Sequence, residues 1–200
     1  MQVELRNIAH HYGTGPLLFH DLYATLLPGH VYAITGPSGS GKSTLLGIIA
    51  GWTRPTQGTV ERHEVASMRW VFQNPHGIAQ RTAIDHVCLP LLAKGRTRSQ
   101  AESQASHLLE RFNLGKIATQ RFSDLSGGEA QRLMLARAFA ACPSLMLVDE
   151  PTAQLDMTTA AVVSESLAHM AGANTIVVVS THDSRTRDAC TDIIDLKDYQ

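Results

Sequence analysis

A glycine-rich turn between a short buried strand and a helix is the feature that most restricts how this chain can fold. Val31–Thr35 is a run of β-forming side chains, and the turn after it contains three glycines before a helical pattern begins at Lys42. That pattern continues to Ala50 and stops at Gly51, a residue type that commonly follows a helix end. We therefore predict a strand, a tight turn and a helix in succession.

The turn matches the pattern G-x-x-x-x-G-K-[ST] in full. Its glycines let consecutive backbone N–H groups converge on phosphate oxygens, and the helix N-terminus adds a positive dipole. Lys42 would bridge the β- and γ-phosphates of a nucleotide, and the Ser43 hydroxyl would bind Mg²⁺. An ordinary glycine turn with Ser43 as a helix starter is the alternative. The predicted nucleotide-binding residues are Gly36, Pro37, Ser38, Gly39, Ser40, Gly41, Lys42, Ser43 and Thr44.

Two acidic residues follow a second apolar run. Leu145–Val148 is predicted to be a buried strand, and Asp149 stands at its carboxyl end. The Asp149 carboxylate would hold Mg²⁺, usually through a water molecule. Glu150 points elsewhere and can orient or activate an attacking water. The alternative is a simple strand-to-loop turn, since Asp-Glu-Pro is good turn chemistry.

The apolar pattern predicts an α/β fold. Ser144–Val148 and Thr175–Val179 are continuous apolar runs, typical of strands covered on both faces of a parallel sheet. A helical pattern lies between them, giving a β-α-β unit. Between about residues 80 and 141 the signal turns helical, with an apolar face over Ala101–Phe112 and a buried helix over Glu129–Ala141. We interpret this block as a helical insertion on the core. Further short strands are predicted at Val3–Leu5, Thr59–Val60 and Arg69–Phe72.

The composition excludes several classes of protein. Lys and Arg number 17 and Asp and Glu number 18 in a chain of 200 residues, so no global attraction to nucleic acid is expected. No apolar run approaches the roughly 20 residues needed to cross a bilayer, and the N-terminus has no signal-peptide pattern. The scattered cysteines argue against a disulfide framework or a zinc site and favour a reducing, cytosolic location: Cys88, Cys142 and Cys190.

The segment Leu125–Glu129 reads LSGGE and resembles the LSGGQ signature of ATP-binding cassette (ABC) ATPases. In that family the signature faces the γ-phosphate held by a second protomer, which implies a head-to-tail dimer enclosing two nucleotides. The same residues also form a Ser-x-x-Glu capping box, and both interpretations can hold. The resemblance adds four nucleotide-binding residues: Ser126, Gly127, Gly128 and Glu129.

Further motifs occur in the family's order. Gln73 matches the Q-loop glutamine, which senses the γ-phosphate and Mg²⁺, and His182 matches the switch histidine. Tyr12 matches the aromatic residue that stacks on adenine, although core packing also explains a tyrosine. Asp156 lies in a segment resembling the D-loop, with Gln154 where alanine is more frequent, and it also reads as a helix N-cap. The resemblance implies Glu150, His182 and Gln73 as catalytic residues, and Ser43, Gln73 and Asp149 as metal ligands.

The resemblance covers Val3 to about Ile194. It implies a P-loop NTPase core with a mostly parallel sheet, a small antiparallel β-subdomain and a helical subdomain at about 80–141, all in one ABC ATPase domain of residues 1–200. It implies an ATPase that uses ATP and Mg²⁺, pairs with a second copy of itself and drives separate transmembrane permease subunits. Those subunits would hold it at the cytoplasmic face of the cell membrane. The macrolide-export and lipoprotein-release branch is the most similar, which favours export.

Two alternatives stay open. A soluble ABC ATPase of the iron–sulfur assembly type has similar spacing, whereas a nucleoside kinase or small GTPase would leave the LSGGE segment and His182 unexplained. The chain also departs from the family in one respect. Only 31 positions separate Lys42 from Gln73 (73 − 42), fewer than in related cassettes, so the stretch Val60–Met68 is expected to be abbreviated.

Overall fold

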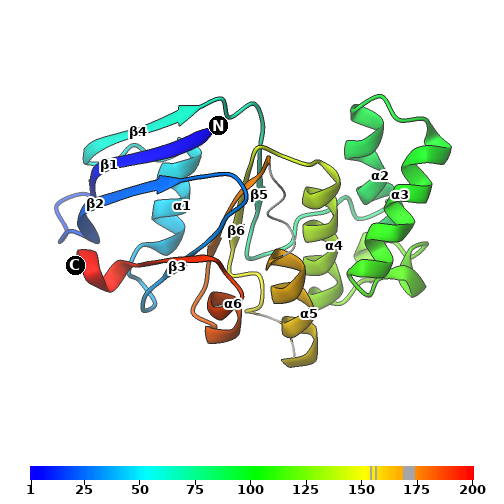
Figure 1. Cartoon of the computed structure of the whole chain (residues 1–200). Helices are drawn as coiled ribbons and strands as arrows, with labels where there is room; N and C mark the ends of the chain where they lie inside the picture. The colour runs from blue at the N-terminus through cyan, green and yellow to red at the C-terminus, as the bar shows by residue number, and fades with distance from the viewer. Residues whose placement is uncertain (154, 156, 169–173) are drawn as a thin grey trace.

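The computed structural model describes residues 1–153, 155, 157–168 and 174–200. Within these residues the larger sheet has five parallel strands in the order β5-β6-β7-β3-β8 (Figure 1). The prediction of a parallel sheet is confirmed. In that order the strands are Met68–Val71, Leu145–Asp149, Ile176–Ser180, Val31–Thr35 and Asp192–Asp195.

The smaller sheet is antiparallel and has the order β2-β1-β4, spanning Phe19–Leu26, Gln2–His10 and Gln57–His63. Helix α1, Lys42–Ala50, lies between this sheet and the parallel one (Figure 1). Only residues 64–67 join β4 to β5. The two sheets thus enclose α1 as a layered unit.

Alternate residues along the central strands face two separate apolar cores. In β6, Leu145 and Leu147 pack with α1 and the antiparallel sheet, whereas Met146 and Val148 pack with the helices on the other face. All five β6 residues are buried. This burial on both faces explains why the strand sequence is continuously apolar instead of alternating.

The helical block lies on the far side of the parallel sheet from the antiparallel strands (Figure 1). Its helices are α2 at Ala83–Ala93, α3 at Arg98–Arg111 and α4 at Gly127–Ala140. The predicted apolar face of α3 is buried at Ala101, Ala105 and Leu109. The remaining elements are α5 at Met157–Ala168, α6 at Ser184–Asp188, and 3₁₀ turns at Gly115–Ile117, Phe122–Asp124 and Leu196–Tyr199.

Candidate functional site

Three neighbouring strands end at the same edge of the parallel sheet and bring the predicted motifs together. The glycine turn follows β3, Asp149 ends β6, and His182 comes two residues after β7. A cavity of about 620 Å³ lies at this edge, the place where open α/β sheets bind ligands. Its lining consists of Tyr12, Leu18, Ser38, Gly39, Gly41, Lys42, Ser43, Thr44, Gln73, Glu150 and His182.

The glycine turn is shaped by close packing on one side and openness on the other. A Cβ on Gly36 would lie 2.6 Å from the Ser40 hydroxyl oxygen, and one on Gly41 would lie 2.9 Å from the Phe19 ring. Both glycines have positive φ angles, 146° and 95°, which side chains disfavour. A Cβ on Gly39 would meet nothing within 4 Å. The turn is therefore packed closely against the protein at Gly36 and Gly41, whereas its backbone at Gly39 is open to a ligand.

Lys42 is buried at the centre of this turn. Its Nζ donates hydrogen bonds to the carbonyl oxygens of Gly36, at 3.1 Å, and Pro37, at 3.2 Å. The same ammonium group lies 3.7 Å from Glu150 Oε1. Lys42 therefore joins the turn to the acidic end of β6.

Ser43 and Asp149 lie side by side, and their oxygens are suitable ligands for a divalent cation. Ser43 Oγ donates to Asp149 Oδ1 at 3.0 Å, and the Ser180 hydroxyl donates to the same oxygen. Hydroxyl and carboxylate oxygens are the hard ligands that Mg²⁺ prefers. The buried Ser40 hydroxyl, which has no hydrogen-bond partner among the described residues, adds a further polar group to the turn. The residues present thus fit a phosphate–Mg²⁺ group.

The Glu150 carboxylate is held in position by the local backbone conformation and by His182. Glu150 has a φ of 46°, a strained value for this residue type, and its N–H donates to the Ser180 carbonyl at 3.0 Å. Glu150 Oε2 accepts from the His182 backbone N–H at 3.4 Å and lies 2.8 Å from His182 Nδ1. Glu150 and His182 therefore act as a pair at the cavity wall.

Tyr12 lies in the loop between β1 and β2, with 60% of its surface exposed. This exposure excludes the core-packing alternative. Its hydroxyl lies 3.2 Å from Thr44 Oγ1, and the His10 ring meets its ring edge-on at a centroid distance of 4.7 Å. Burial lowers the pKa of His10, which keeps its ring neutral. The Tyr12 ring thus lies at the cavity with most of its surface exposed.

The residues of the LSGGE segment lie outside the cavity formed by their own chain. None of Ser126, Gly127, Gly128 and Glu129 lines this cavity. Ser126 caps α4, and the predicted capping box is present: Glu129 N–H donates to Ser126 Oγ, and Ser126 N–H donates to Glu129 Oε2. Hydrogen bonds from Ser126 lower the pKa of Glu129. Ser126 and Gly127 are exposed. Gln154 and Asp156 lie outside the described residues.

One residue near the site was missed by the sequence analysis. Gln131 in α4 is only 2% exposed, and its Nε2 donates to the carbonyl of Phe72 at 3.1 Å. Phe72 directly precedes Gln73, so this bond joins the helix that begins at the LSGGE segment to the Q-loop. A polar side chain within a mostly apolar helix was the available signal, because buried amides require partners.

Comparisons with known proteins agree with this geometry. Residues 19–153 match the family model described as ABC transporter. The chain is 36% identical to the lipoprotein-releasing system ATP-binding protein LolD of Anaeromyxobacter dehalogenans, over 98% of this chain and 90% of the relative. It is also 36% identical to the macrolide export ATP-binding/permease protein MacB of Nitrobacter winogradskyi, over 98% of this chain but 33% of that longer protein.

A solved structure has the same fold. The ATP-binding cassette MJ0796, in a dimeric post-hydrolysis state bound to ADP and Pi, superimposes with a TM-score of 0.83 at 30% identity, covering 97% of this chain and 94% of the other. This likeness confirms the predicted α/β fold with its parallel and small antiparallel sheets. No helix in the described part of the chain has the length and apolar character needed to span a bilayer.

Proposed function

Because the chain belongs to the ABC transporter family of ATP-binding proteins, which hydrolyse ATP, we propose that Glu150 and the glycine turn form its ATPase site and that this site drives a separate membrane-spanning subunit. The convergence of Lys42, Ser43, Glu150 and His182 around one cavity carries the proposal. The iron–sulfur assembly alternative is not favoured, because relatives at 36% identity are named for lipoprotein release and macrolide export.

ATP binding would use the turn and the exposed tyrosine. The backbone N–H groups of residues 36–44 and the Lys42 ammonium would hold the phosphates, while the Tyr12 ring would stack on adenine. Ser43, Asp149 and Gln73 would hold Mg²⁺, which neutralises charge that develops on the phosphates.

Hydrolysis would depend on Glu150. Its carboxylate is held by two bonds from His182, so one oxygen is oriented while the other faces Lys42. A carboxylate held in this way can orient a water molecule and accept its proton as the water attacks the γ-phosphate. Gln73 and His182 line the same cavity and would contact the γ-phosphate.

A second copy would complete each site. The exposed Ser126 and Gly127 at the start of α4 do not line the cavity of their own chain, which supports a head-to-tail dimer in which each copy supplies them, with Gly128 and Glu129, to the other. The dimeric cassette structure supports this assembly. The difference in affinity of the open and closed dimer for ATP and ADP would supply the driving force.

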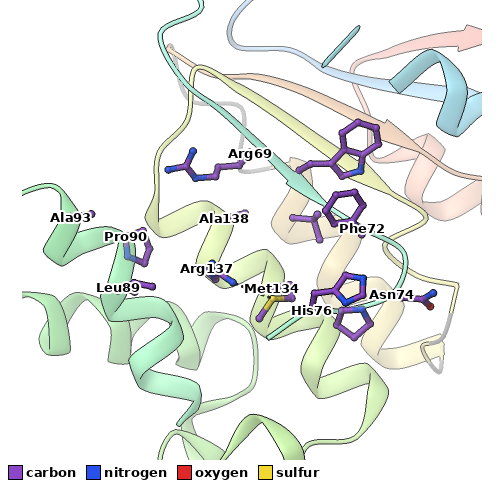
Figure 2. Close-up of a pocket in the computed structure, with 13 residues that line it drawn as sticks. Arg69, Phe72, Asn74, His76, Leu89, Pro90, Ala93, Met134, Arg137 and Ala138 are labelled. Carbon is purple, nitrogen blue, oxygen red and sulfur yellow. Dashed lines mark hydrogen bonds between the residues drawn. The ribbon is translucent and has the colours of Figure 1, made fainter. Parts of the chain in front are cut away.

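Transport requires a membrane partner. We propose that residues 1–200 form one ABC ATPase domain at the cytoplasmic face of the cell membrane, held there by permease subunits that contact the region near Gln73 and the helical block. Figure 2 shows a groove at this place, lined by Phe72 and Asn74 on either side of Gln73 in the sequence and by residues of α2 and α4. Names of relatives in lipoprotein release and macrolide export favour export.

The deciding experiment is purification of the tagged chain from detergent-solubilised membranes. We expect a multi-span protein to co-purify in stoichiometric amount and to alter the ATPase rate. Lys42→Ala is the matched control, since it should retain the membrane partner while losing ATP binding. Recovery of soluble partners alone would overturn the transport function, and unchanged ATP affinity in Lys42→Ala would overturn the nucleotide site.

A further inference from the structure

His10, the last residue of β1, is a buried histidine two positions before Tyr12. Only 6% of its surface is exposed, and its Nε2 atom is buried without a hydrogen-bond partner among the described residues. A buried polar nitrogen without a partner has a cost that an apolar side chain would avoid. Filling of the core therefore does not by itself explain a histidine at this position.

A shift in strand register turns His10 toward the interior. Leu5 belongs to the core, and strict alternation would place His10, five positions later, on the opposite face of the strand. The pairing of β1 with β2 shifts between Leu5 and Ile8, and Asn7 has a φ of 54°. His10 then lies opposite the fully buried Phe19, and opposite residues of paired strands share one face. Irregularities of this kind commonly redirect a side chain near a functional site.

The ring of Tyr12 has a support that is separate from the support of its hydroxyl. The centroids of the His10 and Tyr12 rings lie 4.7 Å apart, and their planes meet at 86°. Aromatic rings attract one another in this perpendicular arrangement. The Tyr12 hydroxyl lies 3.2 Å from Thr44 Oγ1, on the helix that follows the glycine turn. His10 thus contacts the ring, whereas Thr44 contacts only its polar end.

Thr56 ties His10 to the rest of the antiparallel sheet. The Thr56 hydroxyl oxygen lies 3.5 Å from His10 Nδ1 and accepts a hydrogen bond from the His11 N–H at 3.2 Å. The Thr56 N–H donates to the carbonyl of Ala9 at 2.9 Å. Because Thr56 directly precedes β4, these contacts join the start of β4 to the end of β1. The imidazole is therefore anchored outside the nucleotide cavity.

An anchored tyrosine ring favours binding of a base. An exposed aromatic side chain in a loop has rotamer freedom, and a ligand that stacks on it must pay for the loss of that freedom. The contact with His10 restricts the Tyr12 ring before any nucleotide arrives. Because 60% of Tyr12 stays exposed at the cavity, the restricted ring can still receive a base.

We propose that His10 is a positioning residue of the adenine site, which holds the Tyr12 ring in the orientation that stacks on the base. The proposal rests on the proposed function, in which Tyr12 binds adenine, and adds the side chain that orients it. His10 does not line the cavity. It therefore acts through Tyr12 and not by contact with the nucleotide.

The affinity of the whole chain for Mg–ATP, compared with its affinity for Mg–triphosphate, tests this role by calorimetry. Inorganic triphosphate can occupy the glycine turn but has no base. His10→Leu removes the ring, so ATP should bind about fivefold more weakly while triphosphate affinity is unchanged. His10→Phe restores a ring and should bind ATP within twofold of wild type. His20→Leu, at a half-exposed position on β2, is the matched control and should change neither affinity. An equal loss for both ligands in His10→Leu would overturn the positioning role.

A double-mutant cycle with Tyr12 provides an independent measurement. In a Tyr12→Ala chain, His10→Leu should weaken ATP binding no further, because the ring that it orients is gone. In the otherwise wild-type chain it should raise the KM for ATP with a small change in kcat, the pattern of lost binding that does not change at the transition state. Additive losses of ATP affinity would overturn this proposal and leave stacking on Tyr12 standing. An unchanged ratio of ATP to triphosphate affinity in Tyr12→Ala would overturn the adenine site itself.

Discussion

The ammonium group of Lys42 lies 3.7 Å from the Glu150 carboxylate and joins the phosphate-binding turn to the end of β6. Both side chains are almost entirely shielded from solvent, so the interaction is only weakly screened. The phosphates of a nucleotide compete with this carboxylate for the same ammonium group. The charge of Glu150 therefore opposes nucleotide binding, although its oxygens serve hydrolysis.

Replacement of Glu150 by glutamine should separate these two effects. Glu150→Gln removes the negative charge and the proton acceptor, so ATP should bind at least as tightly as to the wild type while the hydrolysis rate falls at least 100-fold, within the usual 10²–10⁴ range for such groups. Equilibrium binding and single-turnover hydrolysis measure the two quantities. Glu110→Gln, at an exposed position on α3, should change neither. Turnover close to wild type in Glu150→Gln would show that another group activates the water.

The ring of Tyr12, more than its hydroxyl, should determine affinity for the nucleotide. Tyr12→Ala should raise the KM for ATP about tenfold with a small change in kcat, because stacking of an aromatic side chain on a base contributes about 1–3 kcal/mol. Tyr12→Phe keeps the ring and removes only the bond to Thr44, so its KM should rise about twofold. Steady-state kinetics at varied ATP concentration test both variants. Equal KM values for the two would assign the effect to the hydroxyl.

The bond from Gln131 to the Phe72 carbonyl should be required for correct placement of Gln73. Gln131→Leu leaves that carbonyl without its donor, at a cost of about 1–3 kcal/mol in stability, and should lower kcat. Gln131→Glu is informative because a protonated carboxyl can donate to the carbonyl and an ionised one cannot. Its activity relative to wild type should therefore recover as the pH falls, whereas that of Gln131→Leu should not. Parallel pH profiles for the two variants would exclude this positioning role.

His86 should make the stability of the helical block depend on pH. Burial lowers the pKa of His86, with positive charge from Arg137 acting in the same direction. Its Nε2 accepts from the Ile78 N–H at 2.9 Å, and its Nδ1 lies 2.8 Å from the Thr82 carbonyl, which requires a neutral ring. The unfolded chain takes up the proton at a higher pH than the folded chain, so stability is lost as the pH falls below about 6.5.

Urea unfolding at pH 7.5, 6.5 and 5.5 measures this effect. His86→Gln should flatten the pH dependence of the unfolding free energy, which a single such group can make as steep as about 1.4 kcal/mol per pH unit. His107→Gln, at an exposed position on α3, is the matched control and should follow the wild type. A wild-type slope in His86→Gln would place the pH dependence elsewhere.

The strands and helices with uninterrupted patterns could be predicted from the sequence, and the others could not. Val31–Thr35 and Lys42–Ala50 have the predicted bounds, because their signals are local. Strand β2 was missed because a positive φ at Asp21 and shifts in register interrupt its alternation. Strand β8 was missed because it has only two apolar residues between two aspartates.

The candidate site likewise combines residues that the sequence could predict with a contact that it could not. Tyr12, Lys42, Gln73, Glu150 and His182 line one cavity, and sequence alone could indicate this because three of their segments follow strands of one parallel sheet. The bond between Gln131 and Phe72 joins residues 59 positions apart. Neither periodicity nor a motif relates two such positions, since the bond depends on how α4 lies against β5.

The central place of β3 has a consequence for biosynthesis. Its hydrogen-bonding neighbours are β7 and β8, which leave the ribosome long after the glycine turn itself. Until Ile176–Ser180 has been translated, the glycine turn follows a strand that has no hydrogen-bonding neighbour. Such delayed long-range pairing slows folding and exposes nascent chains to aggregation. A translation product that stops before residue 176 would contain the full glycine motif yet lack both strands that flank β3 in the folded chain.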